Sequence, residues 1–257
     1  MITAGLDIGT RTAKVVLLQD GKILAAPISP VNDAVDKLAR CLLKSALQSA
    51  GVSRWKIKGL AATGYGRKAV KAARREFPDA VCVAQGAHFL DPEIRTVIDI
   101  GGLITRAIMV GKNGGVEDYL ENEKCASGSG RFLEMIAEAL EVPIAEIGPL
   151  SLRAKKPLDL TSQCVVFAES EVVSRVNAGE EPADILAGLH SSIAERAATI
   201  ARRLGFQPPV AVVGGVAKNR GVIHFLEKSL GLELTALSQD PQTIAALGAA
   251  LMAKTIK

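Results

Sequence analysis

The chain contains one pattern of residues twice. The segment GLDIGTRTAKVVLLQDGKI near the N-terminus aligns with VIDIGGLITRAIMVGKNGG at an offset of 92 residues. The alignment pairs Asp7 with Asp99, Gly9 with Gly101 and Lys14 with Arg106. A duplication of this kind constrains the fold more strongly than composition does, because both copies must form the same local structure.

Each copy has the pattern of a β-hairpin. An apolar run leads into a tight glycine turn, and a second, β-branched run ends at Asp20-Gly21 or at Asn113-Gly114. Asn-Gly is a strong hairpin signal because both residues readily adopt positive φ. Two ordinary hairpins that share an Asp-Ile-Gly triplet by chance are the alternative to a duplication.

The two hairpins have the chemistry of a phosphate site. Glycines after an aspartate let backbone N–H groups approach phosphate oxygens, and a carboxylate can hold hydrated Mg²⁺. Two similar α/β lobes with one hairpin each could therefore clasp the same polyphosphate. We expect Asp7 and Asp99 to be catalytic. The expected nucleotide contacts are Gly9, Thr10, Arg11, Thr12, Lys14, Gly101 and Gly102. For Lys14, a solvent-facing side chain is the favoured alternative.

A third glycine-rich stretch, VAVVGGVAKNRG, begins at Val210. It predicts an apolar strand that enters Gly214-Gly215, where the lack of side chains would let a purine lie flat against the backbone. Val216 and Asn219 complete the predicted nucleotide contacts of this motif.

The three glycine motifs together resemble those of the sugar kinase, heat-shock-protein-70 and actin superfamily, and TIAALGAALMA resembles its closing helix. The resemblance implies an α/β fold of two duplicated lobes that binds ATP or ADP. Lobe I would comprise residues 1–91 with the C-terminal helix 242–257, and lobe II residues 92–241. A Walker P-loop is excluded because ASGSGRF has Arg131 in place of the required lysine, and a Rossmann fingerprint is absent from the sequence.

Two cysteines lie in segments that differ from ordinary protein core. Cys125 stands in NEKCASGSGRFLEMI, before a helix predicted from about Ser129 to Leu140. The amides at a helix start favour a thiolate or an anionic cluster. Cys164 stands in LTSQCVVFAESEVV, a strand-like run that turns helical near Glu169.

These two thiols amount to half of a metal site, because structural zinc and four-iron clusters normally take four protein ligands. The remaining candidate ligands are predicted to be structural. Cys41, on a helical pattern, and Cys82, in a short strand-like run, are expected to be buried, inert thiols, and His88, His190 and His224 lie in helical or structural segments. A twofold dimer would bring Cys125 and Cys164 opposite the same pair of a second subunit. Two buried thiols without a ligand are the alternative.

The cysteine motifs, together with ATGYGRKAV, resemble the BadF/BadG/BcrA/BcrD ATPase family. Its members are activators of 2-hydroxyacyl-CoA dehydratases or ATPase subunits of benzoyl-CoA reductases. The resemblance covers nearly the whole chain. It implies a dimer with one [4Fe-4S] cluster held by Cys125 and Cys164 of both subunits. ATP and Mg²⁺ would drive a low-potential electron to a CoA-ester dehydratase or reductase, and reduced ferredoxin or flavodoxin is the expected donor.

The sequence departs from that family at the second glycine turn. Typical members have Gly-Gly-Gln-Asp, whereas this chain has Gly-Gly-Leu103-Ile104. The loss of a polar pair could weaken hydrolysis, so a heterodimer with a more regular ATPase subunit is an alternative to a homodimer. Glu169 is the candidate for orienting water or Mg²⁺, with capping of the following helix as the alternative. A small-molecule kinase of the same fold and a non-hydrolysing regulatory subunit are the other functions considered.

Composition excludes few functions but disfavours two. The net charge of +4 is mild and the charges of both signs are mixed along the chain, so we expect no binding of nucleic acid. The longest apolar run is about half of a membrane span, so we expect a cytoplasmic protein. The pattern also predicts a long scaffold helix between Pro182 and Gly205, and a basic helix from Gly66.

Overall fold

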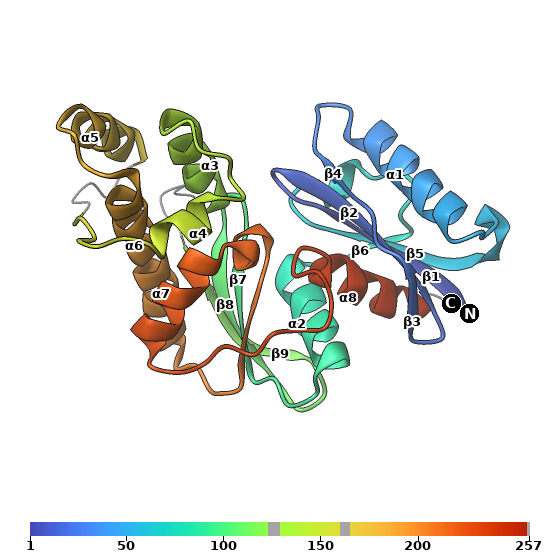
Figure 1. Cartoon of the computed structure of the whole chain (residues 1–257). Coiled ribbons are helices and arrows are strands. Elements are labelled where there is room, and N and C mark those ends of the chain that lie inside the picture. The colour runs from blue at the N-terminus through green and yellow to red at the C-terminus, as the bar shows by residue number, and fades with distance from the viewer. Residues whose placement is uncertain (123–128, 160–164, 256–257) are drawn as a thin grey trace. The chain divides into compact units, whose positions relative to one another are not determined.

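The computed structural model describes residues 1–122, 129–159 and 165–255. Strands predominate up to residue 121, and helices predominate after it (Figure 1). In chain order the elements are β1 (Ile2–Ile8), β2 (Thr12–Gln19), β3 (Lys22–Ala25), β4 (Ile28–Pro30), α1 (Val35–Ser49), β5 (Ile57–Thr63), β6 (Arg75–Glu76), α2 (Asp79–Leu90), β7 (Thr96–Ile100), β8 (Thr105–Val110), β9 (Val116–Glu121), α3 (Gly130–Ala139), α4 (Ile147–Ser151), α5 (Val165–Asn177), α6 (Pro182–Leu204), β10 (Val210–Val213), α7 (Arg220–Leu230) and α8 (Ile244–Met252).

The first sheet is built on the β1–β2 hairpin. Its strand order is β3-β2-β1-β5-β6, and β4 also pairs with β2. β1 and β2 are antiparallel, in a register that places Asp7 directly opposite Lys14, whereas β5 runs parallel to β1. The turn that ends β2 has positive φ at Asp20 and Gly21, as the sequence predicted.

Helices cover both faces of this sheet because its central strands are buried on both sides. Val15 and Leu17 of β2 belong to a core with α1, whereas Val16 and Leu18 pack with α8. Figure 1 shows α1 and α8 on opposite faces of the strands. A Cβ atom built at Gly5 would overlap the backbone of Ala246 and Ala250, so the glycine lets α8 approach β1 closely.

The second sheet has the strand order β10-β7-β8-β9. Its main core joins Ile98 and Ile100 of β7 to apolar side chains of α3, α6 and α7. The long helix α6 begins at Pro182 and ends before Gly205, which adopts the left-handed conformation, so this prediction is confirmed.

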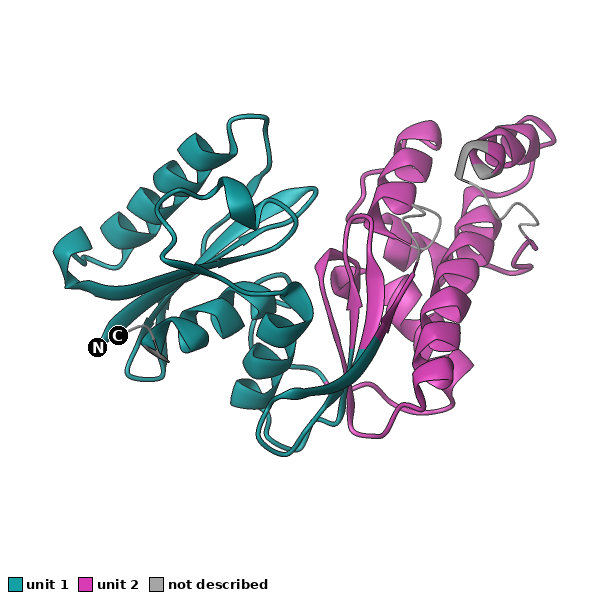
Figure 2. Ribbon diagram, turned by 180° about the vertical axis from the view of Figure 1, so that it is seen from behind, with its two compact units in different colours: residues 1–97, 108–119, 236–257 teal, residues 98–107, 120–235 magenta. Residues whose placement is uncertain are grey.

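The chain divides into two compact units (Figure 2). Unit 1 comprises residues 1–97, 108–119 and 236–257, and unit 2 comprises residues 98–107 and 120–235. The division passes through β7, β8 and β9, and it assigns α8 to the unit that contains β1. The lobe boundaries expected from the sequence, 1–91 with 242–257 and 92–241, stay a prediction.

Three local expectations were wrong. Cys82 lies in the helix α2 instead of a strand, because a helix that is buried on most sides lacks the polar stripe that reveals helical periodicity. Cys41 lies on α1 and is exposed. The basic segment from Gly66 forms a short 3₁₀ turn at Arg67–Ala69, followed later by β6, and so it is not a regular helix.

Within residues 1–122, 129–159 and 165–255, no helix combines the length and the apolar character that a membrane span requires.

Candidate nucleotide site and cysteine segments

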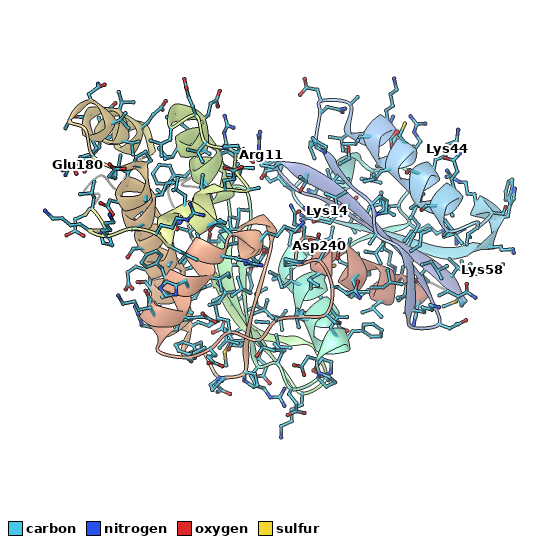
Figure 3. The ribbon with its side chains drawn as sticks, viewed as in Figure 1. Arg11, Lys14, Lys44, Lys58, Glu180 and Asp240 are labelled. Carbon is cyan, nitrogen blue, oxygen red and sulfur yellow. The ribbon has the colours of Figure 1, made fainter. Side chains whose placement is uncertain are left out.

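The β1–β2 hairpin, which we call hairpin 1, contains a buried ion pair. The Lys14 Nζ lies 3.0 Å from Asp7 Oδ2, and each side chain is only 10% exposed. The turn is closed by a hydrogen bond from the Gly9 amide to the Thr12 carbonyl, at 3.0 Å. Figure 3 shows Arg11 at the tip of this hairpin, with Lys14 farther along β2. The favoured expectation that Lys14 faces solvent was therefore wrong.

A loop after β5 lies against hairpin 1. The Gly66 amide donates to the Ile8 carbonyl at 2.9 Å, and a Cβ atom at Gly64 would overlap Asp7 Oδ1 and the Ile8 carbonyl. Gly64 has a φ of 89°, and its amide donates to Asp79 Oδ1 at 2.8 Å. Sequence reasoning did not assign a role to this loop, although the glycines of ATGYGR were the signal for it.

The β7–β8 hairpin, hairpin 2, repeats this geometry. The Gly101 amide donates to the Ile104 carbonyl at 2.8 Å, which corresponds to the bond between Gly9 and Thr12 in hairpin 1. Arg106 Nε lies 3.6 Å from Asp99 Oδ2, and the Asp99 side chain is 16% exposed. Arg106 Nε also lies 3.9 Å from Glu121 Oε2. This Arg106–Asp99 separation is thus longer than the 3.0 Å between Lys14 and Asp7.

The predicted adenosine motif lies beside hairpin 2. Gly214 follows β10 with a φ of 89°, and a Cβ atom there would overlap the Ile100 carbonyl and approach Asp99 Oδ1 to 2.8 Å. Gly215 is exposed, whereas Val216 is buried in the core of unit 2. Only the backbone of Val216 therefore remains available to a ligand. Asn219 caps α7 by accepting a hydrogen bond from the Val222 amide at 3.1 Å.

The first turn of α3 is tied to hairpin 2 by two backbone hydrogen bonds. The Gly130 amide donates to the Gly101 carbonyl and the Arg131 amide donates to the Gly102 carbonyl, each at 2.9 Å. The helix spans Gly130–Ala139 with Ser129 and Leu140 as its caps, as predicted. The segment that contains Cys125 therefore joins a helix whose start is bonded to the second glycine turn.

Cys125 and Cys164 lie outside the described residues. The helices that follow them in the chain, α3 and α5, contact one another, and Val172 of α5 shares a buried core with Phe132 of α3. Among the described residues, no three His, Cys, Asp or Glu side chains gather in a way that could hold a metal ion. Cys125 and Cys164 stay the predicted ligands of an iron–sulfur cluster.

Glu169 lies within α5, and its side chain is exposed. Because α5 already begins at Val165, Glu169 does not cap the start of that helix, and this alternative was wrong. Its proposed role with water or Mg²⁺ stays a prediction.

The predicted inert character of Cys82 agrees with its surroundings. The side chain is fully buried in α2, and burial raises the pKa of its thiol to about 12. A thiol with such a pKa stays protonated at neutral pH and is a poor metal ligand.

The duplicated hairpins, with one glycine loop against each, define the ATPase fold shared by actin, heat-shock protein 70 and sugar kinases. A ROK family glucokinase from Streptomyces griseus, solved with glucose and AMPPNP, has a TM-score of 0.62 to this chain at 16% identity, and each chain is covered over 100% of its length. At this identity the likeness shows the fold alone.

The chain belongs to the BadF/BadG/BcrA/BcrD ATPase family, whose profile matches residues 4–253. It is 40% identical to the activator of lactoyl-CoA dehydratase from Anaerotignum propionicum, over 98% of this chain and 97% of that protein. It is 36% identical to one of the subunits of benzoyl-CoA reductase from Thauera aromatica, over 97% of this chain and 92% of that protein.

A solved structure agrees closely with this fold. The activator of 2-hydroxyisocaproyl-CoA dehydratase from Clostridium difficile, with bound ADPNP, has a TM-score of 0.92 at 36% identity, covering 100% of this chain and 98% of that one. The resemblance stated from the sequence, and with it the fold class, is therefore confirmed.

Proposed function

We propose that this protein is an ATP-dependent activator that delivers an electron to a CoA-ester dehydratase or to a reductase of the benzoyl-CoA type. The observation that carries the proposal is the pair of hydrogen bonds from Gly130 and Arg131 to the carbonyls of Gly101 and Gly102. A change at the second glycine turn on nucleotide binding would be transmitted through these bonds to α3, and so to the chain on either side of it. The cysteine motif lies on the N-terminal side.

Each hairpin has a distinct proposed role in holding ATP or ADP. In hairpin 1, the Lys14 charge compensates Asp7, so the backbone of Gly9 to Thr12 remains to contact phosphate oxygens. In hairpin 2, Asp99 is more open and is the better candidate to hold hydrated Mg²⁺. Gly214, Gly215 and the Val216 backbone are proposed to take the adenosine part, with Asn219 beside them.

The cysteine thiols are proposed to bind half of a [4Fe-4S] cluster, which the same two residues of a second subunit would complete. The chemistry of the donor set fits, because thiolates are the ligands that these clusters take. A cluster of this kind supplies a one-electron carrier whose potential depends on its surroundings. The start of α3 places positive helix-dipole charge near the segment that contains Cys125, which favours a thiolate there.

The partners follow from the relatives by analogy. One relative is named for the CoA-ester dehydratase that it activates, and another for the CoA-ester reductase to which it belongs. We propose a partner of the same substrate class here. A reduced ferredoxin or flavodoxin is the proposed electron donor. A homodimer is the simplest assembly that supplies four thiolates.

A second assembly is favoured by one observation. Leu103 and Ile104 are apolar in the turn of hairpin 2, and Leu103 is 37% exposed. An exposed apolar side chain at a turn proposed to bind phosphate cannot orient water or Mg²⁺. The chain could then be a hydrolysis-impaired subunit that pairs with a second ATPase subunit of a heteromeric reductase.

The experiment is an assay of ATP hydrolysis on protein purified without oxygen. The protein is divided into a dithionite-reduced and an oxidised portion, and ADP release is measured with Mg²⁺ present. An ATP-dependent activator hydrolyses ATP at rates that differ between the redox states, whereas an impaired subunit binds ADP in a calorimeter but does not hydrolyse ATP.

Three results would count against the proposal. Absence of ADP binding would remove the nucleotide site, and equal hydrolysis in both redox states would remove the link to electron transfer. A colourless protein that phosphorylates a small hydroxylated compound would support the kinase alternative.

A further inference from the structure

A chain of side-chain hydrogen bonds connects three helices of unit 2. His190 on α6 lies at its centre, with its Nδ1 2.7 Å from Ser151 Oγ of α4. On the other side of the ring, His190 Nε2 lies 3.1 Å from Nδ2 of Asn219. Asn219 is the residue that caps α7, in the loop that follows Gly214 and Gly215.

The donor and acceptor of each hydrogen bond follow from the backbone groups that Ser151 and Asn219 contact. Ser151 Oγ donates to the Gly148 carbonyl at 2.8 Å, so this oxygen accepts from the Nδ1–H of His190. Asn219 Oδ1 accepts from the Val222 amide, so its Nδ2 group donates to His190 Nε2. The chain therefore requires a neutral imidazole that carries its proton on Nδ1.

Burial keeps the imidazole in that state. His190 and Ser151 are 0% and 1% exposed, and desolvation lowers the pKa of His190 to about 4. A proton on Nε2 would face the donor group of Asn219 and break the bond.

The backbone around the chain leaves little room for another arrangement. A Cβ atom at Gly221 would overlap Ser151 Oγ and His190 Nδ1, and a Cβ atom at Gly148 would lie 2.7 Å from Asn219 Oδ1. The side chain of Asn219 is thus held by the start of α7, by His190 and by close packing on α4. Its amide orientation is fixed before any ligand binds.

We propose that His190 is a positioning residue that, with Ser151, holds the side chain of Asn219 for the adenosine part of the nucleotide. This inference rests on the proposed function, because it assumes that the loop from Gly214 to Asn219 binds that part. His190 and Ser151 would set the affinity for ADP without touching it, since the orientation of the Asn219 amide decides which groups it can offer to a ligand.

Two substitutions of His190 test its hydrogen bonds to Ser151 and to Asn219 separately. His190→Gln places an amide oxygen near the position of Nε2, so it can still accept from Asn219. His190→Asn reaches only the position of Nδ1, so it keeps the Ser151 contact and leaves Asn219 without its partner. ADP affinity measured by calorimetry is expected to stay within about threefold of the wild type in His190→Gln and to fall about tenfold in His190→Asn.

Inorganic tripolyphosphate is the second probe, because it lacks the adenosine part. Its affinity is expected to be the same in the wild type and in both variants. Equal losses for ADP and tripolyphosphate would overturn the proposal, since His190 would then act on the site as a whole. Ser151→Ala is a milder variant that removes the hydrogen-bond partner of His190 Nδ1 without creating a large cavity. About a threefold loss of ADP affinity is expected from it.

Ile193→Ala is the matched control, because Ile193 is a fully buried residue of α6 whose apolar side chain takes no part in the hydrogen bonds of His190. It is expected to lower the midpoint of thermal unfolding and to leave ADP affinity unchanged. A loss of ADP affinity equal to that of His190→Asn would overturn the proposal. Unchanged ADP affinity in folded His190→Asn and Ser151→Ala proteins would also overturn it, whereas a wild type that binds no ADP would instead contradict the proposed function.

Discussion

Hairpin 1 and hairpin 2 share one backbone design but hold their aspartates differently. Each has a glycine amide bonded across its turn, to Thr12 in hairpin 1 and to Ile104 in hairpin 2. In hairpin 1, Lys14 lies 3.0 Å from Asp7, and both side chains are 10% exposed. In hairpin 2, the corresponding separation between Arg106 and Asp99 is 3.6 Å, and Arg106 lies near a second carboxylate.

The loops against the two hairpins show the same duplication. Gly64 follows β5 and Gly214 follows β10, both with a φ of 89°, and a Cβ atom at either would overlap the hairpin beside it. The two glycine loops therefore approach their hairpins in the same way. We propose that the two carboxylates differ in role, with Asp7 mainly structural and Asp99 mainly chemical.

The largest expected effect is on stability. Lys14→Met removes a cationic partner of the buried Asp7 carboxylate and is expected to lower the free energy of unfolding by about 3–5 kcal/mol. Arg106→Met is expected to lower it by about half as much, because the Asp99 side chain keeps more contact with water. Urea unfolding of the nucleotide-free variants measures both values. Equal losses would remove the difference between the hairpins.

The second prediction concerns catalysis. Asp99→Asn is expected to reduce the rate of ATP hydrolysis about 100-fold and to raise the Mg²⁺ concentration needed for half-maximal rate. Asp7→Asn is expected to reduce the rate less and to lower the midpoint of thermal unfolding more. Steady-state kinetics over a Mg²⁺ series make the comparison, and a larger kinetic effect at Asp7 would reverse the assigned roles.

The third prediction concerns how the free energy of unfolding depends on pH, and it starts from the side chains that hold the two glycine loops. Asp79 holds the Gly64 loop through a charged group, whereas neutral His190 holds Asn219. The folded-state pKa of His190 is about 4, below its ordinary 6.5, so the unfolded chain binds more protons between these values and stability falls as pH falls.

Between pH 7 and pH 5, the wild type is expected to lose about 2 kcal/mol more unfolding free energy than His190→Gln. Urea unfolding at the two pH values tests this. Parallel losses in the two proteins would show that His190 does not titrate on unfolding.

The smallest expected effect tests the apolar turn of hairpin 2. The double variant Leu103→Gln, Ile104→Asp introduces the polar pair that typical family members have at this turn. If the apolar pair limits hydrolysis, the rate is expected to rise about tenfold with little change in ADP affinity. The variant Thr10→Leu makes the reverse change in the turn of hairpin 1, and no gain in rate is expected from it. An unchanged rate in the double variant would place the limit elsewhere.

Local signals explain the parts of the fold that were predicted. The Asp20-Gly21 and Asn113-Gly114 turns specify the two hairpins, and Pro182 with Gly205 bounds α6 through backbone preferences of single residues. The duplication also predicted that Asp7 and Asp99 occupy equivalent positions in the two hairpins.

Contacts between distant segments account for what the sequence did not reveal. The buried position of Lys14 depends on helices that cover both faces of β2, and polarity alone suggested solvent. The bond from Gly130 to Gly101 joins residues that are far apart in the chain, and the correspondence of Gly64 and Gly214 is hidden because their flanking residues do not repeat. The helix at Cys82 was missed because a short apolar run in the sequence does not distinguish a buried helix from a strand.

The most direct test measures the iron and acid-labile sulfide content of the protein purified without oxygen. We expect about four iron atoms for every two chains in the wild type and in Cys41→Ser, a change at an exposed cysteine of α1. We expect loss of the iron in Cys125→Ser. Iron content that is unchanged in Cys125→Ser, or wild-type protein without iron, would contradict the claim that each subunit provides half of a shared cluster.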